Sequence, residues 1–157
     1  MTNTGRPVEL SVIFFSDSGP ERHDGYQLVF DLAEFADRNG FTAVWVPERH
    51  LHPFGGSYPN PAVLAAALAQ RTRNVRIRAG SVVLPLHHPI EVVESWGMVD
   101  QLSSGRVDVA FASGWNPNDF IVSPGTYESL RDVWLERIPI VQALWRGEPT
   151  SFTNPRG

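Results

Sequence analysis

Short apolar runs alternate with longer amphipathic stretches along the chain. Runs rich in β-branched and aromatic residues predict four strands, at residues 8–15, 43–46, 75 to about 85, and 107–112. Apolar residues at helical spacing predict four helices between and after them, at residues 26–38, 62–70, 89–102 and 127–145. Strands that start about 32 to 35 residues apart have the period of one βα unit. Four such units in succession indicate a parallel sheet.

The turn after the first predicted strand distinguishes between two classes of fold that contain a parallel sheet. A doubly wound nucleotide-binding sheet usually carries GxGxxG there, whereas this chain has FFSDSGPERHDG. We therefore expect the (β/α)8 TIM-barrel type. A complete barrel needs about 250 residues, so residues 1–157 are expected to be one domain holding the first four βα units.

Composition narrows the chemistry. The 157 residues include 13 Arg and no Lys, which excludes a Schiff-base, pyridoxal-phosphate or Walker-type lysine within this sequence. Cysteine is absent, which excludes disulfides, thiolate nucleophiles and iron–sulfur clusters. The formal net charge is −4 without a dense basic block, so we expect a small-molecule partner rather than nucleic acid or a membrane surface. No signal peptide or membrane-length apolar run is recognised, and the cytoplasm is the expected location.

In parallel α/β folds the ligand lies at the carboxyl ends of the strands. Four such ends carry polar or small residues: Ser16-Asp17, Glu48-Arg49-His50 with His52, Leu84-Pro85 with His87-His88, and Ser113-Gly114-Trp115-Asn116 with Asp119. These groups are expected to converge on one face of the molecule.

Several of these residues have other interpretations. His50 and His52, with Glu48 nearby, have the spacing of a metal-dependent hydrolase site, although no complete ligand set can be assembled. Glu48 and Arg49 equally suit an ion pair that fixes the loop, and one histidine of the 87–88 pair suits a helix cap. The arginines around the third strand are expected to form a solvated surface: Arg71, Arg73, Arg76 and Arg78.

Three stretches in order resemble the amino-terminal half of the bacterial luciferase-like, flavin-dependent monooxygenases, most closely the natural-product branch. They are VWVPERHLHPFGGSYPNP at 44–61, RIRAGSVVLPLHHPIEVVESWGMVDQLSSGRVDVAFASGW at 76–115, and NPNDF at 116–120. With the helix that ends in LWRGE, the resemblance covers about residues 8 to 148.

The resemblance implies a barrel that takes reduced FMN from a separate flavin reductase and uses oxygen to oxygenate a small or carrier-bound substrate. It implies a bulge at Gly80-Ser81-Val82 under the flavin ring, where the family often has a non-prolyl cis peptide. It also places Ala112, Ser113 and Gly114 along the ring, and His50 as a proton donor or acceptor. Glu48, Arg49, Trp115 and Asn116 are assigned to the substrate pocket.

Two positions depart from the family pattern. Luciferases have two histidines where this chain has Arg49-His50, so light emission is not implied. The natural-product branch often has histidine at the position of Asn116. Because half a barrel leaves two open edges and an incomplete flavin site, two readings stand: an enzyme or part of one, and a non-catalytic half-barrel that dimerises or binds flavin. In either case we expect a homo-oligomer or association with a carboxyl-terminal half.

Overall fold

The computed structural model describes residues 8–15, 25–52, 58–154 and 156. Four strands and four α-helices alternate along these segments. They are β1 (Ser11–Ile13), α1 (Gln27–Arg38), β2 (Ala43–Val46), α2 (Pro61–Arg71), β3 (Arg76–Val83), α3 (Pro89–Ser103), β4 (Val107–Ala112) and α4 (Leu130–Trp145). Three short 3-10 turns, at Leu84–Leu86, Asp119–Val122 and Pro124–Thr126, lie in the loops that follow β3 and β4. The predicted strand end Ser16-Asp17 lies outside the described residues.

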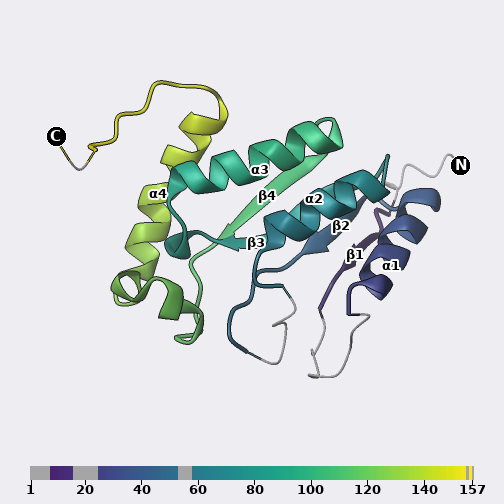
Figure 1. The fold of residues 1–157 in the computed structure, drawn as a ribbon, viewed down its shortest axis with the longest axis horizontal. Helices are drawn as coiled ribbons and strands as arrows, with labels where there is room; N and C mark the ends of the chain where they lie inside the picture. The colour runs from purple at the N-terminus through teal and green to yellow at the C-terminus, as the bar shows by residue number, and fades with distance from the viewer. Residues whose placement is uncertain (1–7, 16–24, 53–57, 155, 157) are drawn as a thin grey trace, which may run out of the picture.

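The strands form one parallel sheet in the order β1-β2-β3-β4, as the βα repeat predicts. Ser11 pairs with Ala43, and Ala43 pairs in turn with Arg76. Figure 1 shows α2 and α3 across one face of this sheet, with α1 beside β1 and α4 beside β4. Sequential order with all helices outside is the arrangement of consecutive units in a (β/α) barrel.

Two elements, β1 and α4, differ from the sequence prediction by three or more residues at one end, whereas the others differ by at most two. β1 covers three residues rather than 8–15, because its partner β2 offers only four residues for pairing. Single backbone hydrogen bonds extend the contact to Leu10 and Phe14. α4 begins at Leu130 rather than near residue 127, since the chain first makes the 3-10 turn Pro124–Thr126.

The core lies between the sheet and its helices. Alternate strand residues such as Val44, Ile77 and Val107 are buried against α2 and α3. The other face, which is the inside of a barrel, carries polar side chains. There Arg76 and Arg78 both pair with Asp108 of the neighbouring strand. These two arginines stay partly exposed, as expected of a solvated surface, and the adjoining strand also supplies them with a carboxylate partner that the sequence did not indicate.

Two polar side chains fasten the amino-terminal end of the sheet. Arg106 donates hydrogen bonds to three backbone carbonyls at the carboxyl end of α2 and just beyond it. They belong to Ala69, Thr72 and Val75. Asp37 at the end of α1 accepts hydrogen bonds from three consecutive backbone N–H groups, at residues 73–75. Both contacts satisfy backbone groups that a helix end or loop otherwise leaves without partners.

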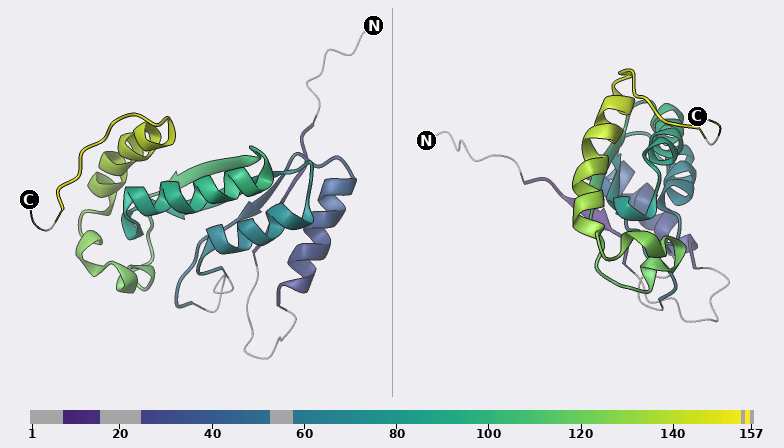
Figure 2. Two further views of the ribbon diagram at one scale, coloured as in Figure 1. Left: turned by 45° about the horizontal axis from the view of Figure 1, so that its top comes forward. Right: turned by 90° about the vertical axis from the view of Figure 1, so that its left-hand side faces the viewer.

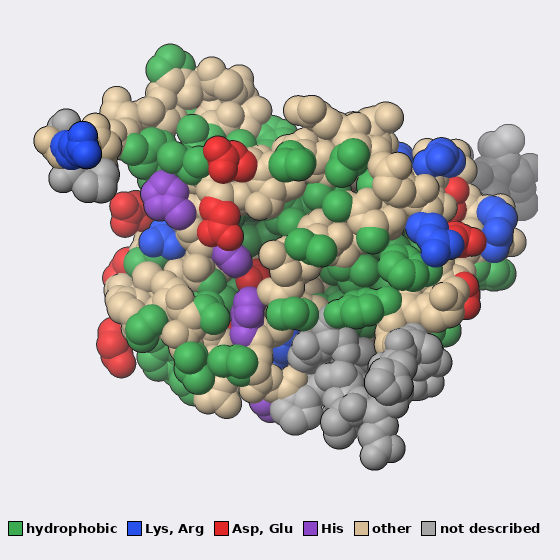
Figure 3. Space-filling model, in the orientation of Figure 1, with side chains coloured by type: hydrophobic (Ala, Val, Ile, Leu, Met, Phe, Trp, Pro, Cys, Tyr) green, Lys and Arg blue, Asp and Glu red, His purple; other side chains and the backbone are tan. Residues whose placement is uncertain are grey.

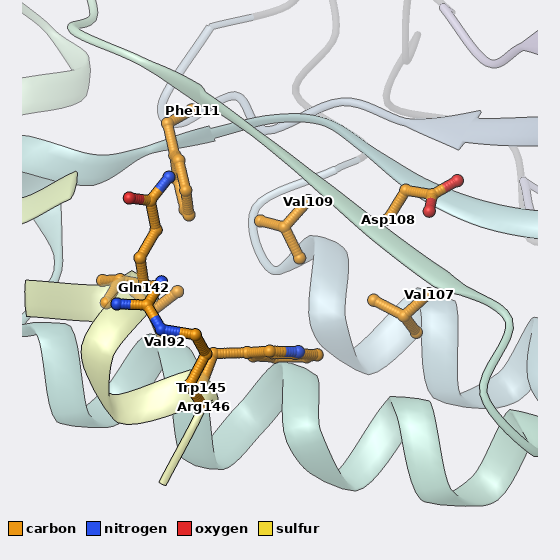
Figure 4. Close-up of a pocket in the computed structure, with 9 residues that line it drawn as sticks. Val92, Val107, Asp108, Val109, Phe111, Gln142, Trp145 and Arg146 are labelled. Carbon is orange, nitrogen blue, oxygen red and sulfur yellow. The ribbon is translucent and has the colours of Figure 1, made fainter. Parts of the chain in front are cut away.

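An apolar groove of about 510 Å³ follows the free edge of β4. Figure 4 shows its walls, with Val107, Val109 and Phe111 of β4 facing Gln142 and Trp145 of α4. In a sheet, the next strand would pair at this edge and place its helix-facing side chains in the groove.

None of the helices in the described segments is both long and apolar enough to span a bilayer.

Candidate functional site

A pocket of about 320 Å³ opens at the carboxyl ends of β2, β3 and β4. Its lining combines apolar walls with a few polar groups: Phe15, Pro47, Glu48, Arg49, His52, Gly80, Ser81, Val83, Ala112, Gly114, Trp115 and Asp119. This composition and volume are typical of a small-molecule site, since such pockets range from about 300 to 1,000 Å³.

The middle of β3 forms one wall of the pocket through a break in its pairing. The register with β4 shifts between Ala79 and Val82, which marks the predicted bulge, and the Gly80–Ser81 peptide bond is cis. A Cβ at Gly80 would lie 3.1 Å from the Trp45 ring, so a side chain here would crowd that ring. Glycine therefore keeps this strand close to its neighbour.

Gly114 shapes the wall at the end of β4. Its φ of +79° is a left-handed conformation that glycine adopts without cost. A Cβ at this position would lie 2.8 Å from both Phe120 and Val83. The loop therefore turns tightly over the pocket only with glycine at residue 114.

Arg49 connects the second strand end to the fourth. Its Nη1 lies 3.3 Å from Oδ2 of the buried Asp119, and its guanidinium carbon lies 4.6 Å from the centre of the Trp115 ring. The other Asp119 oxygen accepts a hydrogen bond from the His50 backbone. The buried Nε of Arg49 has no hydrogen-bond partner among the described residues. A buried donor of this kind can bind an acceptor on a ligand.

Glu48 is the most enclosed charged group of the site, with its side chain fully buried. Its Oε2 accepts the Val83 N–H at 2.7 Å, and its Oε1 lies 2.8 Å from Nε2 of His50 and 2.5 Å from Nε2 of His87. Burial alone would raise the pKa of Glu48, but the hydrogen bonds from His50 and His87 lower it below its ordinary value. Glu48 is therefore an ionised carboxylate between two imidazoles.

His87 is the second imidazole that contacts this carboxylate. Burial alone would lower the pKa of His87, but the hydrogen bond and negative charge of Glu48, with Glu91 nearby, raise it above its ordinary value. Nδ1 of His87 lies 3.6 Å from an oxygen of Glu91 on α3. The backbone carbonyl of His87 accepts a hydrogen bond from Arg137 of α4, which fixes the loop in place.

The structure brings together seven of the residues that the sequence assigned to the site. They line the pocket: Glu48, Arg49, Gly80, Ser81, Ala112, Gly114 and Trp115. The other four are not in its lining. Val82 is buried in the core opposite Phe111, Ser113 lines a separate shallow surface pocket, Asn116 bonds its own turn, and the His50 ring contacts Glu48.

The structure also tests the alternative interpretations of these residues. His88 is the predicted helix cap, since its Nδ1 accepts the Ile90 N–H, whereas its neighbour His87 binds Glu48. Glu48 and Arg49 each have another partner instead of forming an ion pair together. His52 lies in the pocket lining and outside the group of Glu48, His50 and His87, so the H-x-H pair of a hydrolase site is not formed.

Sequence reasoning missed two features of the site. It recognised neither His87 as a partner of Glu48, 39 residues away, nor Asp119 as the anchor of Arg49, 70 residues away. Both had been named as strand-end residues. Their pairing follows only once the neighbouring strands are in register.

The residues of the pocket fit a flat, mostly apolar ring with hydrogen-bond acceptors at its rim. Gly80 and Gly114 add no side chain to the lining, and the Nε of Arg49 is a donor without a partner among the described residues. Flavin is a ring of this kind. These features are compatible with the flavin that the resemblance implies.

Comparison with known proteins gives the family. The model of the luciferase-like monooxygenases matches residues 8–154. The oxygenase component of a flavin-dependent trigonelline monooxygenase from Acinetobacter baylyi is 35% identical over 130 residues, which are 78% of this chain and 34% of that protein. The 4-hydroxyprotoasukamycin monooxygenase of Streptomyces nodosus subsp. asukaensis is 36% identical over 57% of this chain and 24% of its own length.

Solved structures show the same fold. Monooxygenase RslO1 from Streptomyces bottropensis superposes with a TM-score of 0.86 at 31% identity, over 94% of this chain and 46% of that chain. The oxygenating constituent of 3,6-diketocamphane monooxygenase from Pseudomonas putida, solved with FMN, gives 0.82 at 24% identity, over 95% and 43%.

Fold and pocket together define an α/β barrel-type protein with a pocket at the strand ends. The chain belongs to the luciferase-like monooxygenase family. It spans about a third of the trigonelline monooxygenase component and under half of the solved structures named above.

Proposed function

We propose that this chain supplies the flavin-facing part of a monooxygenase that uses reduced FMN and oxygen to oxygenate a small organic or carrier-bound substrate. The observation that carries the proposal is the mostly apolar pocket between the β3 bulge and the end of β4, with the unpartnered Nε of Arg49 beside it. A separate reductase would supply the reduced flavin, which would provide the electrons and the oxygen-activating chemistry.

Each part of the pocket has an expected role toward that ring. Gly80 and Ser81 of the β3 bulge would hold one side of it, with Ala112 and Gly114 at the end of β4. Arg49 would donate from Nε to an acceptor at its rim, and the exposed Trp115 would cover the substrate side. The apolar walls exclude water from the reacting atoms.

His50 is the proposed proton donor or acceptor for the substrate. Its Nε2–H donates to Oε1 of Glu48, which orients the ring, and its backbone is fixed by Asp119. In a barrel competent for turnover, His50→Ala is expected to lower the oxygenation rate by about 10²- to 10⁴-fold. FMN affinity should change much less. An unchanged rate would assign His50 to loop structure instead.

Titration of the chain with FMN and, separately, NADPH tests the flavin site directly. We expect FMN to bind and NADPH not to compete. Arg49→Lys keeps a positive charge facing Asp119 but lacks the Nε donor, so FMN affinity should fall about 10-fold, the usual loss for a hydrogen bond of this strength. Arg38→Lys on the outer helix α1 is the matched control. Equal FMN affinity in Arg49→Lys and the unaltered chain would remove Arg49 from the site.

A non-catalytic half-barrel that pairs with another chain is the second candidate. The apolar groove beside β4 favours it, because that edge has room for one further parallel strand. We propose that β1 of a second copy occupies this edge when the chain is alone, since Leu10, Ile13 and Phe15 leave an exposed apolar margin on β1. A carboxyl-terminal half would replace that copy in a full barrel.

A further inference from the structure

We propose that Glu48, His50 and His87 form a binding site for one divalent metal ion of the zinc class. Their ligand atoms all lie within 4.8 Å of one another, and they form the metal-ligand group found among the described residues. Two imidazoles and one carboxylate are a known zinc set, with a fourth position left for water. A metal ion on Nε2 of His50 would occupy the atom that donates to Glu48 in the proposed flavin reaction, so metal binding and that role of His50 exclude each other. The test below uses neither flavin nor oxygen.

The present hydrogen bonds already bring the three ligand atoms together. Nε2 of His50 and Nε2 of His87 both face Oε1 of Glu48. In a tetrahedral zinc site with bonds of about 2.0 to 2.2 Å, neighbouring ligand atoms lie roughly 3.3 to 3.6 Å apart. The metal would replace the protons between these atoms, and Oε1 would move away from both nitrogens as it bound. Binding would accordingly release protons to the buffer.

The ligands are held in place by contacts behind them. Oε2 of Glu48 is fixed by the Val83 N–H, the His50 backbone by Asp119, and the His87 carbonyl by Arg137. Nδ1 of His87 faces Glu91 at 3.6 Å, which is the position of the outer carboxylate that commonly orients a metal-bound histidine. Little ordering entropy would therefore be lost on binding.

Space for a further ligand adjoins the cluster. A cavity of about 30 Å³ is lined by Glu48, His87 and Glu91, together with the polar Asn60 and Ser95. That volume is sufficient for one water molecule. Two nitrogen ligands favour zinc, cobalt or ferrous iron over magnesium or calcium, which prefer oxygen alone.

Calorimetric titration of zinc chloride into the untagged, chelator-treated chain tests the site. We expect one zinc ion per chain, with proton release seen as a dependence of the heat on buffer ionisation enthalpy. Loss of an outer partner of a metal ligand typically lowers metal affinity about 10- to 100-fold. His87→Ala removes a ligand itself and should lower zinc affinity by more than that. His52→Ala is the matched control and should bind as the unaltered chain does.

A second pair of variants avoids any loss of core structure. Glu91→Gln should lower zinc affinity about 10-fold, whereas Glu94→Gln, an exposed residue on the same helix, should leave it unchanged. Cobalt should give the visible absorption of a four-coordinate ion. Three outcomes would overturn the proposal: no saturable binding, equal affinity in His87→Ala, or loss of binding in His52→Ala alone.

Discussion

Gly114 shows how one missing side chain sets the shape of the site. It combines a positive φ with neighbours on two sides, Phe120 and Val83, that already fill the space of a Cβ. Gly97 in the middle of α3 differs in both respects, since nothing lies within 4 Å of its Cβ position. Two glycines of one chain therefore predict opposite effects of the same substitution.

Gly114→Ala is expected to destabilise the chain by about 2 to 4 kcal/mol, because backbone strain and overpacking add at this position. The pocket should lose flavin affinity with it. Gly97→Ala should instead stabilise by about 0.5 to 1 kcal/mol, the usual gain from removing a helix-interior glycine. Urea denaturation of both variants measures these changes, and a neutral Gly114→Ala would contradict the close packing described for residue 114.

At the scale of elements, the connection from α2 to β3 depends on a carboxylate from α1. Burial alone would raise the pKa of Asp37, but the backbone N–H groups of Val75, Asn74 and Arg73 lower it below its ordinary value. A carboxyl with a lowered pKa in the folded state stabilises the fold above its unfolded pKa near 4. That contribution is lost as the pH falls through the folded value.

Asp37→Asn should therefore lower the free energy of unfolding by about 1 to 2 kcal/mol at neutral pH. The difference in free energy of unfolding between the variant and the unaltered chain should decrease as the pH falls below about 4. Denaturation curves at several pH values measure it. Asp31→Asn is the control, since Asp31 on the same helix is exposed and accepts its one side-chain hydrogen bond from Gln27. A difference that stays constant with pH would show that Asp37 acts through its shape alone.

Elements with a strong local pattern were predictable from the sequence. β2 and β4 begin and end at the predicted residues, because their apolar runs are bounded by turn residues on both sides. β1 was predicted too long, since its length is set by the four residues of its partner strand. No local pattern in β1 carries that information.

The site was predictable as a set of strand ends but not as a set of contacts. The order of the strands brings Glu48, Gly80 and Gly114 to one edge, which the βα repeat alone indicates. Whether Glu48 binds Arg49 or His87 depends on side-chain direction and burial, which follow from the register of β2 against β3. The ion pairs of Arg76 and Arg78 were not predictable for the same reason, because their partner Asp108 lies one strand away.

For the whole molecule, the free edges of β1 and β4 predict association. The chain at micromolar concentration should sediment as a dimer or larger species rather than as a compact monomer. Trp145→Arg in the groove should weaken self-association, while Leu135→Arg, an exposed residue of the same helix outside the groove, should not. A stable monomer with tight, stoichiometric FMN binding would contradict both the open edge and the incomplete flavin site.

The strand order has a further consequence for how the protein is made. Each strand pairs with the one synthesised just before it, so every pairing closes a loop of roughly 30 residues. Each pairing can form once about 30 more residues have been synthesised, so none of the four strands has to wait for distant sequence to leave the ribosome. The sheet can therefore assemble in the direction of translation, one βα unit at a time, with β4 as the growing edge.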